Sequence, residues 1–261
     1  MQWVEANGAS LRCEVSGAGK ETVVLIHELG GSLESWDVTL PAFQDRFRVL
    51  RYDQRGFGMS EKTRGSLSIN TLNADLVALL DALGIDGPCH VVGIALGGGI
   101  GLGYAIAHPE RVRRLAVTSP AIGRPTAELR ERLLSRAELV EKEGMRAVVD
   151  VSLNRSFPED IRRAVVRFPA YWQRWLTNDP NGFAAINRML AEMNLQPDLH
   201  RIACPTLVIG GAKDSILPPS VIEPVAAAIP GAVYQERDTG HFMHVQTPEL
   251  FLDTVLPFLS A

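Results

Sequence analysis

The 261-residue sequence has few cysteines, no long apolar run and no excess of positive charge. Its three cysteines cannot all pair with one another, and no group of cysteines and histidines has the spacing of a zinc site. We therefore expect buried free thiols and no bound metal. The formal net charge of -4 creates no basic field that would attract a nucleic acid. Because no apolar run approaches bilayer length, we expect no membrane partner.

The first residues of the sequence do not have the pattern of a secretory signal. Residues Met1–Glu5 are not a basic segment leading into an apolar one, as a secretory signal would be, so we expect a cytoplasmic protein. No internal repeat is present. What the sequence does have is the balance of a globular protein, with 46% hydrophobic and 21% charged residues. A chain of this length can form one large core.

Short apolar runs rich in β-branched residues alternate with longer helical patterns. Such runs are typical of parallel strands covered by helices on both faces. From Asn70 to Leu83, leucines recur at helical spacing before Gly84, which predicts a helix. Asn7-Gly8 ahead of Leu11–Val15 predicts an antiparallel hairpin. Parallel strands are predicted at Thr22–His27, Arg48–Tyr52, His90–Gly93, Leu115–Thr118 and Thr206–Gly210. The alternation predicts a doubly wound α/β fold.

One region interrupts this alternation. From Arg124 to His200 the sequence has no strand pattern, only helical segments rich in arginine and glutamate with a late cluster of aromatic residues. We interpret residues 124–200 as a helical cap. Residues 1–123 and 201–261 would then form the α/β core into which the cap is inserted.

Residue 95 lacks the nucleophile that its surroundings predict. Residues 89–99 have the pattern of a buried strand, a sharp turn flanked by glycines and a helix start, in which a G-x-S-x-G motif exposes a reactive serine. Here the turn contains Gly93, Ala95 and Gly97. The methyl group of Ala95 cannot attack a carbonyl carbon. Either the protein works without a serine nucleophile or it is an inactivated form of a protein that has one.

Further motifs follow in a consistent order. Asp214 comes just after a late predicted strand, and His241 lies in a loop before the last predicted helix. With the segments His27–Gly31 and Tyr52–Ser60, this order of nucleophile position, acid and histidine resembles the α/β-hydrolase superfamily over essentially the whole chain. The resemblance implies a mostly parallel, eight-stranded sheet with helices on both faces and an inserted helical cap. It also implies a hydrolase or lyase acting on a small carbonyl compound.

The resemblance assigns roles to individual residues. His241 would be the general base, and Asp214 would accept its Nδ1–H, which fixes the tautomer and stabilises the imidazolium. The backbone N–H groups of Leu29 and Leu96 would form an oxyanion hole. Such backbone donors do not depend on a serine side chain.

Glu28 departs from the resemblance, because the corresponding loop commonly has glycine at this position. If its side chain points inward, a partly desolvated carboxyl group with a raised pKa would act as acid or base, or hold a water near Ala95. If it points outward, Glu28 is a solvated loop residue. Trp36, Trp172 and Trp175 are predicted to line a mostly apolar pocket, which favours a small organic or aromatic substrate.

Other residues near these motifs are expected to be structural. His244 begins the last helix, and Asp53 with Arg55 is interpreted as a pair that braces a turn. The glycine run at residues 97–99 follows the sharp turn and lacks the setting of a dinucleotide-binding motif. Helix packing explains this run better, and we expect no cofactor.

Three functional hypotheses follow. The first is an enzyme without a serine nucleophile, in which His241 and Asp214, alone or with Glu28, perform acid–base chemistry in water-mediated hydrolysis, C–C cleavage or isomerisation. The second is an ordinary serine hydrolase (esterase, enol-lactonase or C–C hydrolase) in which alanine has replaced the serine at position 95. The third is a non-catalytic protein that binds a small ligand. Departures at both Ala95 and Glu28 favour the first. A homodimer is possible for a chain of this size.

Overall fold

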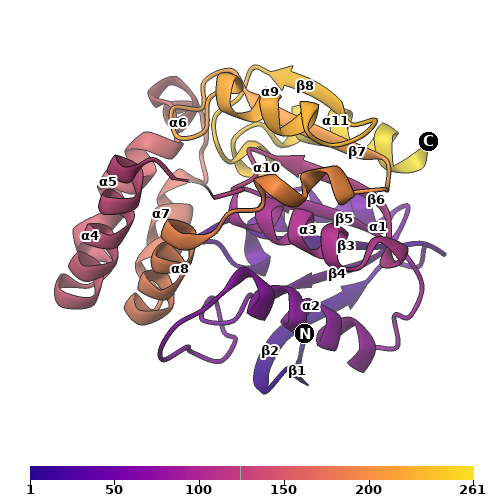
Figure 1. Ribbon diagram of the computed structural model, residues 1–261, viewed down its shortest axis with the longest axis horizontal. Helices are drawn as coiled ribbons and strands as arrows, with labels where there is room; N and C mark the ends of the chain where they lie inside the picture. The colour runs from indigo at the N-terminus through magenta and orange to yellow at the C-terminus, as the bar shows by residue number, and fades with distance from the viewer. Residues whose placement is uncertain (124) are drawn as a thin grey trace.

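The computed structural model describes residues 1–123 and 125–261 (Figure 1). In this part of the chain, eight strands form one sheet in the order β1-β2-β4-β3-β5-β6-β7-β8. Strand β2 is antiparallel to β1 and β4, and the other neighbours are parallel. The strands are β1 (Gln2–Ala6), β2 (Ala9–Ser16), β3 (Thr22–Ile26), β4 (Arg48–Tyr52), β5 (Cys89–Ile94), β6 (Val112–Thr118), β7 (Thr206–Gly211) and β8 (Val233–Arg237). The predicted α/β-hydrolase fold is confirmed.

The predicted strands and the hairpin are found where the sequence places them. Every residue of β5 and β7 is buried, as expected for strands that are covered on both faces. Asn7 and Gly8, both with positive φ, form the two-residue turn between β1 and β2. The three cysteines are buried and free, as predicted.

The register of the parallel strands brings several loops to one edge of the sheet. Ile26 at the end of β3 pairs with Gly93 of β5, and Thr118 at the end of β6 pairs with both Ile94 of β5 and Ile209 of β7. The carboxyl ends of these four strands therefore lie side by side. In open α/β sheets this edge is where ligands bind.

Helices connect the strands and cover the sheet (Figure 1). Helix α3 lies along β5 and β6 and contacts α2. Gly97 in its first turn allows this close packing, because a Cβ atom there would lie 2.1 Å from the carbonyl oxygen of Ile26. The helices of the core are α1 (Leu40–Gln44), α2 (Ile69–Ala82), α3 (Leu96–Ala107), α9 (Pro219–Ala227), α10 (Met243–Gln246) and α11 (Pro248–Ser260), with short 3-10 helices at Leu33–Trp36, Pro109–Arg111 and Gln196–Arg201.

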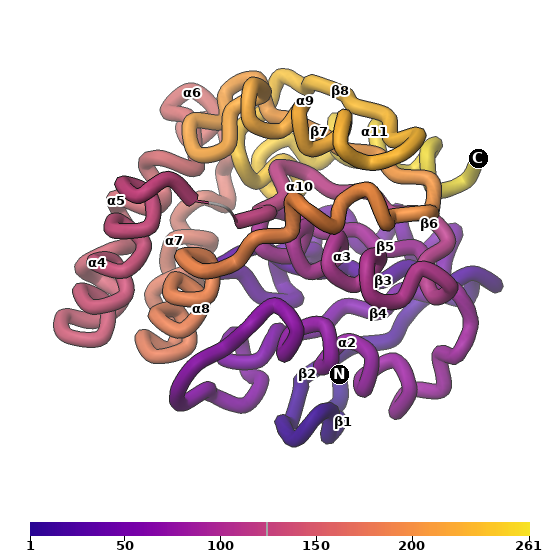
Figure 2. The backbone as a smooth tube through the Cα atoms, viewed as in Figure 1, coloured from indigo at the N-terminus to yellow at the C-terminus, as the bar shows by residue number. Residues whose placement is uncertain are grey.

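Five further helices lie between β6 and β7 in the described residues, beside the carboxyl edge of the sheet (Figures 1 and 2). They are α4 (Ala127–Glu143), α5 (Arg146–Ser156), α6 (Glu159–Ala164), α7 (Phe168–Leu176) and α8 (Pro180–Glu192), and these five helices are called the cap. Where this group meets the core, the N–H of Leu195 donates to the carbonyl oxygen of Ile122 at 2.8 Å. Arg124, the first residue of the expected cap, lies outside the described residues. Among the described helices, none combines the length and the apolar character needed to cross a membrane.

Candidate active site

The turn after β5 has the shape expected of a nucleophile elbow, with Ala95 at its tip. Ala95 has a φ of 50° and a ψ of -109°, a backbone conformation that is strained for a residue with a side chain. Its N–H donates to the carbonyl oxygen of Thr118 at 2.9 Å. The turn is so tight that a Cβ atom at Gly93 would lie 2.3 Å from the carbonyl oxygen of Gly97.

His241 and Asp214, which are 27 residues apart in the sequence, form a close pair. Nδ1 of His241 lies 2.7 Å from Oδ2 of Asp214. The other carboxylate oxygen, Oδ1, accepts hydrogen bonds from the N–H groups of Ile216 and Leu217 at 2.8 and 3.0 Å. Burial alone would raise the pKa of Asp214, but the neighbouring His241 and the N–H of Leu217 hold it below its usual value. Asp214 is thus suited to orient the imidazole of His241.

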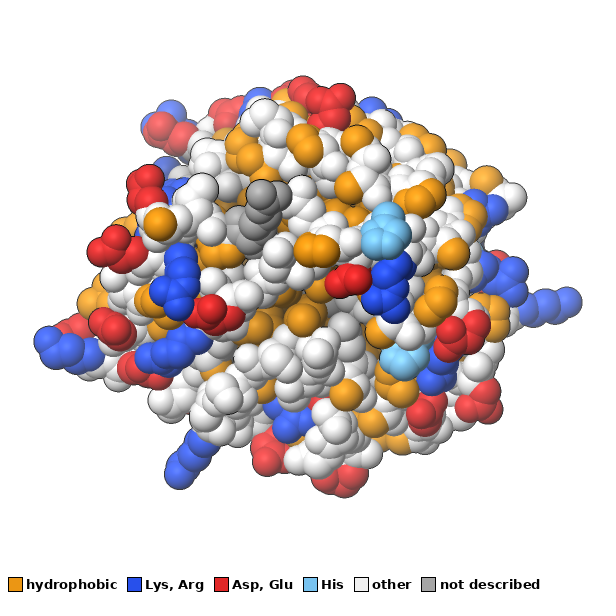
Figure 3. Space-filling model, in the orientation of Figure 1, with side chains coloured by type: hydrophobic (Ala, Val, Ile, Leu, Met, Phe, Trp, Pro, Cys, Tyr) orange, Lys and Arg blue, Asp and Glu red, His pale blue; other side chains and the backbone are white. Residues whose placement is uncertain are grey.

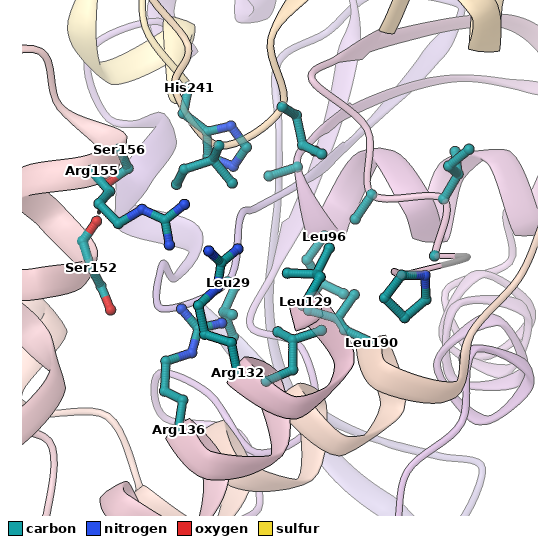
Figure 4. Close-up of a pocket in the computed structure, with 18 of the residues that line it drawn as sticks. Leu29, Leu96, Leu129, Arg132, Arg136, Ser152, Arg155, Ser156, Leu190 and His241 are labelled. Atoms are coloured by element: carbon teal, nitrogen blue, oxygen red, sulfur yellow. Dashed lines mark hydrogen bonds between the residues drawn. The ribbon is translucent and has the colours of Figure 1, made fainter. Parts of the chain in front are cut away.

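A cavity of about 700 Å³ opens beside this pair (Figure 4). Its core side includes Ala95, Leu96, Leu29 and His241, and its opposite side is formed mainly by α4 and α5. The structure therefore brings the elbow, the two predicted oxyanion-hole residues and the predicted base to one cavity. Trp175 also lines it. The remaining lining residues are mostly apolar, which fits a small organic compound.

The structure contradicts the expectation that Glu28 faces the cavity with a raised pKa, because its side chain is wholly buried and is not part of the cavity wall. Oε1 accepts hydrogen bonds from the hydroxyl groups of Tyr171 at 2.7 Å and Ser35 at 2.9 Å. Oε2 lies 3.0 Å from Nε2 of His244. Burial by itself would raise the pKa of Glu28, but His244 and the Tyr171 hydroxyl lower it to about 2. Glu28 is therefore a buried carboxylate that joins the core to the cap.

Two of the three predicted pocket tryptophans lie elsewhere. Trp36 is fully buried, and its ring packs 4.6 Å from that of His244, measured between centroids. Trp172 donates its Nε1–H to Oδ1 of Asp150 at 2.7 Å, and the guanidinium of Arg146 lies over its ring. Each tryptophan thus contacts residues away from the cavity, and the sequence pattern does not reveal these contacts.

The interpretation of Asp53 and Arg55 as one pair is also wrong. Asp53 accepts hydrogen bonds from the N–H groups of Leu33 and Met59, both at 2.7 Å, so it braces the turn after β4 without Arg55. Arg55 instead pairs with Asp75 on α2 at 2.6 Å. The two side chains of the motif thus stabilise different neighbouring segments.

Sequence reasoning missed three arginines of the cavity wall, Arg132, Arg136 and Arg155. The i, i+4 spacing of Arg132 and Arg136 is the one signal that could have placed two of them on the same face of a helix. No group of three or more His, Cys, Asp or Glu side chains that could hold a metal ion occurs in the part of the chain that the structure describes.

Comparisons with known proteins agree with this fold. Residues 23–254 match the model of the alpha/beta hydrolase family. A putative carbamate hydrolase, RutD, from Caulobacter sp. (strain K31) is 34% identical over 246 residues, which cover 92% of this chain and 91% of that protein. 3-Oxoadipate enol-lactonase 2 from Acinetobacter baylyi is 29% identical over 238 residues, with 90% of this chain and 86% of that protein covered.

A solved structure is similar over the whole chain. The enol-lactonase from Burkholderia xenovorans LB400 superposes with a TM-score of 0.95 at 31% sequence identity, and the match covers 100% of both chains. The family match spans most of the sequence, and the superposed enol-lactonase has the same fold over the whole chain. The chain therefore belongs to the alpha/beta hydrolase family.

Proposed function

We propose that this protein hydrolyses a small carbonyl compound, such as an activated ester or a lactone, by general-base catalysis without a serine nucleophile. The observation that carries the proposal is the shared cavity, which is lined by both His241 and the methyl-bearing elbow residue Ala95. The similar proteins above are named as a carbamate hydrolase and as enol-lactonases, which supports a carbonyl compound as substrate.

The mechanism assigns one step to each group. Asp214 keeps the proton of His241 on Nδ1, so Nε2 is free to take a proton from a water molecule as its oxygen bonds to the carbonyl carbon. The N–H groups of Leu29 and Leu96 stabilise the resulting oxyanion. Leu96 suits this role because it begins α3, where the first N–H groups of a helix have no partner within the helix. The imidazolium then returns its proton to the departing oxygen, and the C–O bond breaks.

The mechanism is tested by the absence of a covalent intermediate. The native protein is mixed with p-nitrophenyl esters and with a panel of lactones, and product release is followed from the first turnover. We expect steady turnover without a burst, and intact-protein mass spectrometry should show no acylated protein. An acyl adduct, or full activity in His241→Gln, would refute the proposal.

A second candidate is an ordinary serine hydrolase in which alanine has replaced the nucleophile. The φ of 50° at Ala95 favours it, because this strained turn serves to present a reactive side chain and a methyl group gains nothing from it. The Ala95→Ser variant separates the two candidates. A gain in esterase activity of about 10³-fold or more would support the serine hydrolase, whereas little or no gain would support direct attack by water. Ligand binding without product would instead indicate a non-catalytic protein.

A further inference from the structure

Three arginine side chains form part of the cavity wall. Arg132 and Arg136 lie one turn apart on α4, and Arg155 lies near the end of α5. Figure 4 shows the three side chains extending from these helices into the space beside His241, with their guanidinium groups turned toward one another. Like charges one helical turn apart repel each other, so the stability of α4 alone does not favour this arrangement.

None of the three guanidinium groups has an acidic partner among the described residues, and the described lining of the cavity contains no Asp or Glu. Charged residues on the outside of α4 are paired, since Arg130 contacts Glu192 and Glu141 contacts Arg188, both of α8. The chain as a whole has a net charge of -4, and Figure 3 shows acidic and basic side chains mixed over the visible face. Arg132, Arg136 and Arg155 therefore form a local cluster of positive charge at the cavity.

Arg136 is held in place by neighbours that leave its terminal nitrogens available. Its Nε–H donates to Oδ1 of Asn187 at 2.6 Å, and its guanidinium lies 5.5 Å from the centroid of the Phe183 ring. Asn187 is itself fixed, because its Nδ2 donates to the carbonyl oxygen of Phe183 at 2.7 Å. Burial and the positive charges of Arg132 and Arg155 lower the pKa of Arg136 to about 10, so it stays charged at neutral pH. A cation fixed in this way is ready to bind an anion with little loss of freedom.

We infer that Arg132, Arg136 and Arg155 bind an anionic group of the substrate, a carboxylate or a phosphate, while the carbonyl group to be attacked lies beside His241 and Ala95. Guanidinium groups bind both kinds of anion through pairs of parallel hydrogen bonds. The apolar lining between the two ends of the cavity suits a hydrocarbon segment. The substrate class is then an ester or lactone of a small acid that carries a free anionic group. This inference rests on the proposed function only for the end of the substrate that carries the carbonyl group to be attacked.

The test measures binding by isothermal titration calorimetry. The three probes have the same hydrocarbon chain with a methyl ester at one end, and they differ at the other end. Dimethyl suberate has a second, uncharged ester there, monomethyl suberate has a carboxylate, and methyl 7-phosphonoheptanoate has a phosphonate. We expect the native protein to bind at least one charged probe about tenfold more tightly than dimethyl suberate, as expected for hydrogen bonds between charged groups. The charged probe that binds more tightly identifies the anion that the site prefers.

Two variants should remove this preference. In Arg136→Gln/Arg155→Gln, the affinities for charged and uncharged probes should agree within about twofold, because two of the three guanidinium groups, including the fixed one of Arg136, are absent. Arg132→Gln changes an exposed side chain and should reduce the preference without disturbing the fold, which circular dichroism can check. The matched control is Arg130→Gln on the same helix, which removes a surface ion pair and should keep the full preference.

Equal binding of all three probes by the native protein, or no binding at all, would overturn the inference. So would a preference that persists in both cavity variants. Because calorimetry needs no turnover, these results are independent of the proposed chemistry at His241. A protein that binds the charged probe but hydrolyses nothing would refute the proposed function and leave the arginine site established.

Discussion

This protein contains two buried pairs that each consist of a carboxylate and a histidine. The two pairs differ in the surroundings of the histidine. In one pair, His241 contacts Asp214 at 2.7 Å and lines the cavity. In the other, His244 lies 3.0 Å from Glu28, is fully buried, and packs against Trp36. In both pairs the pKa of the carboxyl group is lower than usual, although burial opposes this shift.

The chemistry of such a pair depends on whether the second ring nitrogen of its histidine can be reached by a substrate. A histidine held by a carboxylate becomes a useful base when its other nitrogen reaches substrate, as the position of His241 permits. Without that access, a carboxylate and a histidine only stabilise the contact between the two segments that carry them. Glu28 follows β3 and His244 belongs to α10, so their contact joins the loop after β3 to this helix.

The strongest test of this difference compares the two histidines directly. We expect His241→Gln to lower kcat/KM for a lactone by about 10²- to 10⁴-fold, because it removes the proposed base. His244→Gln should retain more activity than His241→Gln but unfold at lower urea concentration. Steady-state kinetics and urea denaturation of both variants measure the two effects. Equal activity losses in the two variants would erase the distinction.

Removing the carboxylate of the structural pair should mainly affect stability. Glu28→Gln leaves His244 buried without its charged partner and should lower the free energy of unfolding by about 3–5 kcal/mol. Urea denaturation monitored by circular dichroism measures this change. Glu192→Gln, which changes an exposed carboxylate, is the matched control and should alter stability by less than about 0.5 kcal/mol. If both variants have native stability, the buried pair of Glu28 and His244 does not stabilise the fold.

A smaller effect is expected from the cap side of the same contact. Tyr171→Phe removes the hydroxyl donor to Oε1 of Glu28 while keeping the ring, and should cost about 1.5–3 kcal/mol, the usual value for a hydrogen bond to a charged group. The free energy of unfolding measures it. In the Glu28→Gln background the same change should cost less, because the charged acceptor is already absent. Equal costs in both backgrounds would mean that Tyr171 acts through packing alone.

Acid should weaken the buried pair in a defined pH window. The pKa of Glu28 is about 2 in the folded protein and 4.5 in an unperturbed glutamate, so its stabilising effect is present above pH 4.5 and is lost as the pH falls toward 2. We expect native protein to lose more stability than Glu28→Gln over this range, because the variant has no carboxyl group to protonate at this position. Urea denaturation at several pH values checks this. Parallel losses in both proteins would contradict the assignment.

Much of the fold could be predicted because burial leaves a clear pattern in the sequence. The predicted parallel strands are apolar on both faces and were placed to within three residues at either end. Strand β8 gave no such signal, because it lies at the edge of the sheet and none of its residues is fully buried. Chain order alone was enough to bring together His241 and Asp214, since the family resemblance fixes where each loop lies.

The errors at the site have one common cause, which is that a side chain's direction depends on distant partners. Glu28 is turned away from the cavity by Tyr171, which lies 143 residues later and belongs to the cap. Trp36 looked like a pocket residue until its contact with His244 placed it in the core. The position of Arg155 opposite the arginines of α4 likewise depends on how two cap helices pack.

The way the cap is attached has a consequence for how a substrate reaches the cavity. Helix α7 is bonded to the loop after β3, through Tyr171 and through the Nδ2–H of Asn178 just beyond the helix, which donates to the carbonyl oxygen of Gly30 at 2.9 Å. In contrast, the hydrogen bonds between the described side chains of α4 and other elements go to α8. We therefore expect α4 to move most easily. Movement of α4 would open the cavity to substrate. Because this helix carries Arg132 and Arg136, the attraction between their positive charges and an anionic ligand would then favour the closed position.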